Sequence, residues 1–397
     1  MGIDATVWLY EPTTGDGIEV TSKVFSVNIT RGKSRQLDYY EPGSVTVVLN
    51  NFDRSFDPLN DTSDFQPFVF PKRRISVSSN GLTIFSGLID DWSFTYDPNG
   101  ESYANVYATE DSGLLANMYM FAQSFPQELT GARVDKVLDN SGVAWSTGFG
   151  DRLIDDGTQL LDASSVGAGT NALEYLRQIE SSEQGALFYS PKNFGLVFKD
   201  NNNTLTSSST YELFADDGTI NYSFGTAGKP SIKYDFIDVS YTSQLLYNVI
   251  TVNSYLAPNT SIATDPGSIT AYGVNGLNVD GVLYSSANSL NSLSNLLIRK
   301  YSLPDYRFNS LRVNFYGLDS STQEDLAGLE LGDFAKIKFR PNGIGTAIER
   351  VVQIIGINHD ITPGGHSMIL QFDSIKLPYL VLDDTEFGKL DTYVLGL

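Results

Sequence analysis

Alternation of apolar and polar residues runs through much of the chain and predicts antiparallel strands that each bury one face. In SVTVVLN, residues 44–50, the side chains of Val45, Val47 and Leu49 can all point to one side. The stretch YANVYATE, residues 103–110, alternates in the same way. Turn sequences such as DPNG and TPGG separate many of the predicted strands, so the pattern indicates a mainly β chain.

Helical spacing appears in three segments that lie between strand-rich parts of the chain. In each segment apolar residues recur every three or four positions, as expected for one buried helix face. We expect Thr130 and Thr170 to be the N-caps of the first two helices, and Pro304 to follow the third. The order of elements therefore predicts an α+β insertion in a β protein, with helices within residues 130–142, 170–185 and about 285–302.

An internal repeat relates residues 75–111 to residues 337–373. Each stretch has an apolar strand, an Asn-Gly turn, a strand that ends near Gly87 or Gly356 and a strand that carries Asp91 or Asp360. A Pro-x-Gly turn and a closing strand that ends in Asp111 or Asp373 follow. We interpret the repeat as two related β-barrel-like domains in one chain. Two unrelated meanders that converged on the same pattern are the alternative.

This interpretation divides the chain into four parts. The fold class is then mainly β with an α+β insertion between the two barrel-like domains. The predicted parts are a first β-barrel domain over 1–111, an inserted α+β domain over 112–230, a second β-barrel domain with one helix (about 285–302) over 231–378, and a C-terminal tail over 379–397.

The charge balance is strongly acidic. The 397 residues include 26 Lys and Arg against 47 Asp and Glu, which gives a formal net charge of −21. Such a chain repels phosphate backbones and anionic lipid, so specific nucleic-acid binding is not expected. The absence of cysteine excludes disulfides and thiolate metal sites. We expect no membrane span, because no apolar stretch reaches the necessary length.

Adjacent acidic residues are the main candidates for catalysis. A glycosidase needs two carboxylates on either side of a sugar-binding cleft. Neighbours on a strand point to opposite faces instead, so turn and surface roles are favoured for these pairs. Nucleotide-binding, serine-hydrolase and zinc-protease motifs are missing, so we predict that the protein is not an enzyme. The acidic pairs are Asp90/Asp91, Asp155/Asp156, Asp216/Asp217 and Asp383/Asp384.

Two further groups of residues are candidate metal-binding sites. His359 and His366 are the only histidines, seven positions apart across a turn, and could flank a metal together with Asp360. The loop DRSFDPLNDTSD, residues 53–64, is rich in oxygen ligands but lacks the EF-hand spacing. A structural role is favoured for both groups, so we predict no metal, no cofactor and no catalytic residue.

Residues 29–58, ITRGKSRQLDYYEPGSVTVVLNNFDRSFDP, resemble the N-terminal signature of bacteriophage minor tail proteins of the baseplate-hub or tail-tip-hub type. Residues 174–198 are similar to the helix and hairpin of that family's inserted domain. Residues 351–374 and 381–391 are similar to the family's last barrel and C-terminal tail. The resemblance covers most of the chain, and its first block is the most specific.

The resemblance implies a structural virion protein of the phage tail tip or baseplate, made in the cytoplasm of the host bacterium. In such hubs two barrels per chain and three chains around the axis give a pseudo-sixfold ring. The implied partners are further copies of the chain, the distal tail protein or tail tube, and tip or fibre proteins. The ring would provide a channel for DNA ejection without specific DNA binding. Acidic residues along the channel would avoid ion pairs with phosphate, although solubility is another explanation of the charge.

Charged and aromatic residues around the first predicted hairpin are candidates for contacts between chains. Gly43 would permit a turn, and Tyr39-Tyr40 beside Glu41 combines large amphipathic surface with charge, as interfaces often do. Contacts within one domain are the alternative. The candidate inter-subunit residues are Arg31, Asp38, Tyr39, Tyr40, Arg54 and Asp57.

Two other functions share some of these features. A distal tail protein would form a hexameric ring adaptor from a strand-rich domain, but the long insertion and the second barrel favour a hub. A receptor-binding or tailspike subunit with glycan-degrading activity would be expected to show β-helical repeats or a coiled-coil stalk, and the sequence shows neither pattern.

Overall fold

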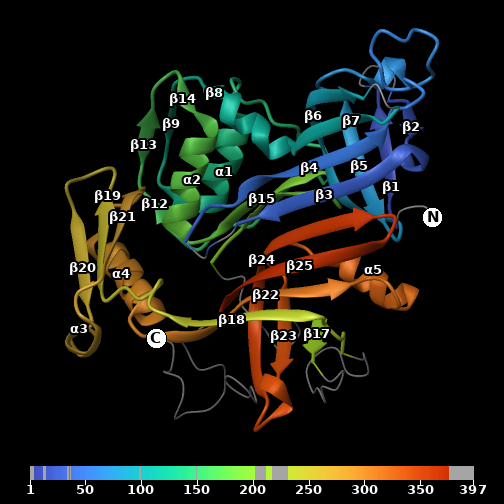
Figure 1. Ribbon diagram of the computed structural model, residues 1–397. Coiled ribbons are helices and arrows are strands. Elements are labelled where there is room, and N and C mark those ends of the chain that lie inside the picture. The colour runs from blue at the N-terminus through green and yellow to red at the C-terminus, as the bar shows by residue number, and fades with distance from the viewer. Residues whose placement is uncertain are drawn as a thin grey trace.

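Strands from the two ends of the sequence lie side by side in the computed structural model, where β3 in blue runs next to β24 in red (Figure 1). These strands belong to one sheet of thirteen strands. The structure describes residues 4–11, 15–33, 35, 37–97, 100–148, 150–201, 212–216 and 231–374.

The large sheet follows one path through both strand-rich parts of the sequence. Its order is β18-β22-β25-β24-β3-β4-β7-β6-β5-β1-β2, with β23 beside β24 and β17 beside β23. Over the described residues the ladder does not close on itself, so the two predicted barrels are two units of one open sheet. The strands are β1 (Thr6–Tyr10), β2 (Gly17–Glu19), β3 (Val24–Gly32), β4 (Glu41–Asn50), β5 (Arg74–Ser79), β6 (Leu82–Tyr96), β7 (Ser102–Glu110), β17 (Glu212–Ala215), β18 (Phe236–Thr242), β22 (Asp305–Asn314), β23 (Phe334–Phe339), β24 (Ile348–Thr362) and β25 (Gly365–Ser374).

The two units repeat one strand order. We call strands β1 to β7 the first unit, and β17, β18 and β22 to β25 the second unit. The order β3-β4-β7-β6-β5 in the first unit matches β18-β22-β25-β24-β23 in the second. The repeat predicted from the sequence corresponds to the meanders β5-β6-β7 and β23-β24-β25. In both, the middle strand has 15 residues, and its pairing with the closing strand shifts at a bulge, at Asp90 in β6 and at Ile355 in β24.

Each unit has its own hydrophobic core on one face of the sheet. Val45, Val47 and Leu49 are all buried in the core of the first unit, as their alternation predicts. In the second unit, Leu311 and Val313 of β22 are buried in the core in the same alternating way. In both units the alternating apolar residues therefore lie on the face of the strands that points into the core.

A third core combines two insertions that are far apart in the sequence. The segment after β7 and the segment between β18 and β22 bury their apolar residues together. The hydroxyl of Ser182 accepts a hydrogen bond from the Leu283 N–H, and Asp162 accepts two from Ser285. The helix predicted at about 285–302 is present as α4, but its leucines pack in this third core and not with the second unit. The helices are α1 (Thr130–Asp139), α2 (Ala172–Glu183), α3 (Pro266–Tyr272), α4 (Ala287–Tyr301) and, beside the sheet, α5 (Ser320–Gly328).

Short strands complete the insertions. They form small sheets of two or three strands around α1, α2 and α4 (Figure 1). Their bounds are β8 (Tyr119–Met120), β9 (Gln123–Phe125), β10 (Glu128–Leu129), β11 (Arg152–Ile154), β12 (Leu160–Leu161), β13 (Ser164–Val166), β14 (Thr170–Asn171), β15 (Ala186–Ser190), β16 (Gly195–Lys199), β19 (Val249–Ser254), β20 (Thr260–Thr264) and β21 (Gly276–Val282).

Both predicted N-caps are displaced by one residue. Helix α2 is capped by Asn171, whose side-chain oxygen accepts a hydrogen bond from the Glu174 N–H at 3.1 Å. Helix α1 begins at Thr130, and the Thr130 hydroxyl donates to the carboxylate of Glu183 at 2.7 Å. The Thr170 hydroxyl donates to the carbonyl oxygen of Gly167 at 2.9 Å, so threonine at both positions makes contacts other than capping.

Some predictions concern residues outside the described part of the chain. These are the tail 379–397, residues 202–211 and 217–230 of the predicted inserted domain, which include Asp217, and Asp383 and Asp384 of the acidic pairs. Among the described helices, none has the length and apolar character needed to cross a membrane.

Candidate inter-subunit surface

The two units of one chain are joined edge to edge by β3 and β24. The strands pair antiparallel from Gly32 opposite Gly356 to Val27 opposite Ile361. Gly32 has φ of 99°, and a Cβ there would lie 2.2 Å from the carbonyl oxygen of Ile355. The close approach of the two backbones therefore requires glycine at this position.

Arg31 lies beside this joint and is buried inside the single chain. Its guanidinium donates to Glu110 at 2.5 Å, to Glu330 at 2.8 Å and to the carbonyl oxygen of Tyr189 at 2.6 Å. Glu110 belongs to the first unit, Glu330 to the second and Tyr189 to the insertion. The structure thus contradicts the prediction that Arg31 contacts another chain, because only 3% of the residue is exposed.

Burial and pairing act in opposite directions on the pKa values of this cluster. Burial lowers the pKa of Arg31, but the carboxylates of Glu110 and Glu330 outweigh it and raise the pKa overall. Burial raises the pKa of Glu110 in spite of Arg31. Burial also tends to raise the pKa of Glu330, but the cations of Arg31 and Lys192 outweigh burial and lower this pKa overall. Arg31 therefore keeps its charge in the protein interior because two acidic residues surround it.

Gly43 supports the same cluster and is not a turn residue. It lies within β4, and its N–H donates to Glu110 at 2.8 Å. A Cβ at this position would lie 2.5 Å from the carboxylate carbon of Glu110. The residue is glycine because the carboxylate packs directly against the backbone.

Of the adjacent tyrosines, Tyr40 is buried and Tyr39 is exposed. The Tyr40 ring packs 5.6 Å from the Phe188 ring, with the Lys33 ammonium 4.7 Å from its centre. The guanidinium of Arg177 lies 5.4 Å from the Tyr39 ring. Burial contradicts an inter-subunit role for Tyr40, whereas Tyr39 and the exposed Asp38 stay candidates.

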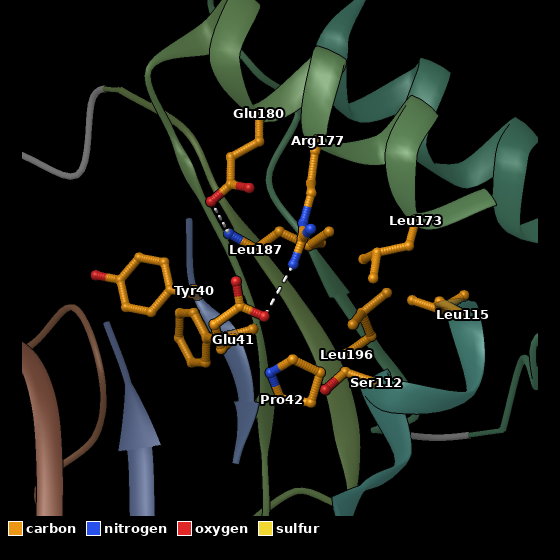
Figure 2. Close-up of a pocket in the computed structure, with 11 residues that line it drawn as sticks. Tyr40, Glu41, Pro42, Ser112, Leu115, Leu173, Arg177, Glu180, Leu187 and Leu196 are labelled. Atoms are coloured by element: carbon orange, nitrogen blue, oxygen red, sulfur yellow. Dashed lines mark hydrogen bonds and ion pairs between the residues drawn. The ribbon is translucent and has the colours of Figure 1, made fainter. Parts of the chain in front are cut away.

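A small pocket next to Tyr40 lies where the first unit meets the insertion (Figure 2). Figure 2 shows Arg177 of α2 reaching Glu41 of β4, an ion pair of 3.1 Å. Deeper in the protein, Glu180 accepts a hydrogen bond from the Leu187 N–H at 3.0 Å. Burial raises the pKa of Glu180 to about 7, against the opposing effects of that hydrogen bond and nearby cations. The pocket is a packing seam between parts of one chain.

Arg54 and Asp57 form an ion pair within one loop. The guanidinium of Arg54 lies 2.6 Å from the carboxylate of Asp57, which also accepts a hydrogen bond from the Leu59 N–H. The Leu59 N–H and the guanidinium of Arg54 lower the pKa of Asp57, and Tyr96 of β6 lowers it further. Asp57 is only 8% exposed, so burial contradicts an inter-subunit role for it as for Tyr40, whereas Arg54 is exposed and its inter-subunit role stays a prediction.

Besides the outer edge of the three-residue strand β2, two edges of the large sheet have no partner among the residues that the structure describes. One is the edge of β6 over residues 91–96, beyond the reach of β5, whose pairing ends at Leu88 opposite Arg74. The other is the outer edge of β18, which pairs only with β22. Unpaired edges expose rows of backbone donors and acceptors, so both are ready to accept another strand.

Apolar side chains accompany both free edges. Along β6, the rings of Trp92, Phe94 and Tyr96 stack at 6.1 and 6.5 Å, and Tyr96 is 51% exposed. On β18, Phe236 and Tyr241 are 52% and 70% exposed. Large exposed aromatics are typical of interaction surfaces.

The two histidines form a buried pair. Nδ1 of His359 lies 2.9 Å from Nε2 of His366, and the Phe315 ring stacks on His366 at 3.9 Å. Asp360 is exposed on the opposite face of β24 and cannot complete a metal site with them. Within the described residues, no three or more His, Asp or Glu side chains are grouped to hold a metal.

The face of the large sheet that points away from the two unit cores is mostly polar. We call the residues of β3, β4, β6, β7, β18, β22, β24 and β25 that are named below the polar face. Their charged side chains are three aspartates and one arginine, and the arginine lies over the Phe236 ring. Outside this set, Arg307 lies opposite Ser240 and is buried, and Lys336 and Lys338 of β23 alternate with the buried Ile337. The polar face consists of Asn28, Thr30, Ser44, Thr46, Asn50, Asp91, Ser93, Thr95, Asn105, Tyr107, Thr109, Asp238, Ser240, Ser310, Arg312, Asn314, Asn358, Asp360, Ser367 and Gln371.

Comparison with solved structures relates this architecture to tail proteins. A tail protein from Neisseria meningitidis MC58 has a TM-score of 0.63 at 12% identity, covering 99% of this chain and 100% of that chain. The 43 kDa tail protein of prophage MuSo2 from Shewanella oneidensis has a TM-score of 0.59 at 12% identity, covering 93% and 98%. The chain has the fold of a phage tail protein.

A third solved structure with a similar fold is a secretion-system protein. The E. coli c3393 protein is described as a component of the type VI secretion system with structural similarity to T4 bacteriophage tail proteins gp27 and gp5. Its TM-score is 0.51 at 10% identity, covering 89% of this chain and 74% of that chain. The resemblance to hub-type tail proteins is thereby confirmed for the fold. By sequence, no family model and no curated protein matches the chain.

Sequence reasoning missed the residues that hold the tail-protein fold together at its centre. Glu110 and Glu180 are buried acids and Glu330 is a partly buried one, and pattern alone does not distinguish them from surface acids. A signal was present for Arg31, because it follows Val27 and Ile29 at even spacing on the buried face of β3. A charged residue in such a series predicts a buried ion pair.

Proposed function

We propose that the chain is a structural hub of the phage tail tip, in which three copies form a ring of six related units. The observation that carries this proposal is the internal repeat, since two units with one strand order already lie edge to edge in each chain. Repeating that relation between chains would produce a ring with approximate sixfold symmetry. The tail-protein fold supports the same role.

In this proposal the ring encloses a passage for DNA, and the polar face lines it. Lysine and arginine would bind phosphates and hold DNA in place, because neutralised phosphates release counterions. The polar face has one arginine, Arg312, among hydroxyl, amide and aspartate side chains. Such a lining supports sliding without retention. The proposed neighbours are the tail tube or distal tail protein on one side and tip or fibre proteins on the other, and the proposed role is not catalytic.

Mass photometry of the purified full-length chain tests the proposed function. Particles of three chains are expected for the hub. Particles of six chains would support the distal tail ring, the second candidate, which a strand-rich ring-building unit also fits. A protein that stays monomeric over the whole concentration range would contradict both functions.

A further inference from the structure

The joint between the two units of one chain gives a template for the joint between chains. The residue after the bulge is Asp91 in β6 and Gly356 in β24, and these two residues lie opposite Tyr107 and Gln371. Position by position, residues 91–96 of β6 therefore correspond to residues 356–361 of β24. The latter are the residues that pair with β3.

The same comparison relates β18 to β3. Asn28 of β3 pairs with Thr46 of β4, which pairs with Tyr107. Asp238 of β18 pairs with Ser310 of β22, which pairs with Gln371. Asn28 and Asp238 thus occupy equivalent positions. The free edge of β18 is the equivalent of the β3 edge that is already paired, and the free edge of β6 is the equivalent of its partner on β24.

We infer that residues 91–96 of β6 in one copy pair antiparallel with residues 237–242 of β18 in a second copy of this chain. This inference rests on the proposed ring and names its contact. Transfer of the β3–β24 register gives the pairs Asp91–Thr242, Trp92–Tyr241, Ser93–Ser240, Phe94–Val239, Thr95–Asp238 and Tyr96–Ile237.

The chemistry of the two edges matches in this register. Trp92, Phe94 and Tyr96 meet an aromatic or β-branched partner on the side of the unit cores, and such cross-strand pairs stabilise antiparallel sheets. Ser93 and Ser240 meet on the polar face, which continues from one copy to the next. A slip by one residue would place the rings of β6 against the polar side of β18.

A second copy is the partner because each chain offers two different edges that complement one another. In the structure six strands, β22, β25, β24, β3, β4 and β7, stand between β18 and β6, and the two edges are not paired with each other. A contact between unlike edges is head to tail, and such contacts close into rings when the rotation permits. The contact would cover the exposed rings of Tyr96 and Tyr241.

Disulfide trapping tests the register directly, since the chain has no cysteine of its own. Directly opposite residues of an antiparallel pair lie at Cα distances that a disulfide can span. The variant Ser93→Cys/Ser240→Cys should form covalent trimers on mild oxidation, seen by non-reducing electrophoresis. The matched control is Thr30→Cys/Asn358→Cys, the equivalent pair within one chain, which should oxidise without any increase in mass.

The outcomes distinguish an error in the proposed strand contact from an error in the proposed ring. Single variants Ser93→Cys and Ser240→Cys should give no covalent trimer. If mass photometry shows trimers and the control pair oxidises, but Ser93→Cys/Ser240→Cys stays monomeric under denaturing conditions, the register is wrong and the hub proposal stands. If the parent chain does not form trimers, the hub proposal fails first. Crosslinking that stops at dimers would overturn the closed arrangement of this contact.

Discussion

Arg31 connects three parts of the molecule through one side chain. Its partners are Glu110 in the first unit, Glu330 in the second unit and the backbone of Tyr189 in the insertion. Ion pairs of this kind add little on balance when formed, but removal of one partner leaves uncompensated charge in the interior. Arg31 therefore helps to hold the first unit, the second unit and the insertion in their relative positions, in addition to its role in local packing.

Replacement of Arg31 by Met should destabilise the protein by about 3–5 kcal/mol, because the buried Glu110 and the partly buried Glu330 lose their cation. Urea unfolding at neutral pH measures the effect. The matched control is Arg54→Met, which removes an ion pair whose guanidinium side chain is 62% exposed and should leave the midpoint almost unchanged. Equal midpoints for the two variants would show that the buried cluster has no special role.

Glu180 should make stability depend on pH between its unfolded and folded pKa values. Burial raises the folded pKa to about 7, whereas the unfolded value is 4.5. The folded protein therefore binds this proton more tightly, so its contribution is fully present below pH 4.5 and is lost as the pH rises towards 7. The variant Glu180→Gln should unfold at higher urea concentration than the parent at pH 8, and the difference should shrink at pH 5. Parallel pH profiles for the two proteins would contradict this assignment.

Among the elements, α4 shows how the insertions depend on each other. Leu293 and Leu297 of α4 are buried in the same core as Val134 of α1 and Leu176 of α2, although the helices belong to separate insertions. The third core should therefore open as one cooperative unit.

Replacement of Leu297 by Ala should cost about 2–5 kcal/mol of local stability, since it leaves a cavity in a packed core. Hydrogen exchange followed by mass spectrometry should show faster exchange in α1 and α2 as well as in α4. The control is Leu311→Ala in the second-unit core, which should leave α1 and α2 protected when the two cores open separately. Faster exchange confined to β19–β21 and α4 would contradict a shared third core.

The elements show what the sequence could predict and what it could not. Alternation located β4 and β7 and placed Val45, Val47 and Leu49 in a core, because strand period is a local property. The repeat of turns predicted the two meanders for the same reason. The pairing of β3 with β24 was not predictable, because it joins opposite ends of the chain and leaves no local pattern.

For the candidate contact residues, the sequence could not show which way each side chain points. Tyr39 and Tyr40 are neighbours, and neighbours on an extended segment point to opposite sides, so only one of them could be a surface contact. The choice between them depends on Phe188 from the insertion, which packs on Tyr40. The free edges of β6 and β18 became visible only once the order of strands in the sheet was known.

At the scale of the whole molecule, the polar face should determine whether DNA binds to the proposed ring or slides past it. The double variant Asn105→Lys/Thr30→Lys should leave assembly intact and create salt-sensitive binding of duplex DNA, because lysines near phosphates release counterions. Electrophoretic mobility at low and high salt measures this binding, and the parent should show none. The matched control adds the same charge elsewhere, at the exposed Asn295 and Asn291 of α4. Equal binding by both lysine variants would show that the polar face does not line the passage.

The joint between β3 and β24 also has a consequence for synthesis on the ribosome. More than three hundred residues separate Gly32 from its partner Gly356. At translation rates of about 5–20 residues per second, the β3 edge of a nascent chain waits roughly 15–65 s for β24. During that time it resembles the edge of β18 and can capture the wrong strand, including a strand of a neighbouring nascent chain. Yields of correctly folded protein should therefore respond to translation speed and to chaperones that cover exposed strands, and truncation before β24 should leave an aggregation-prone product.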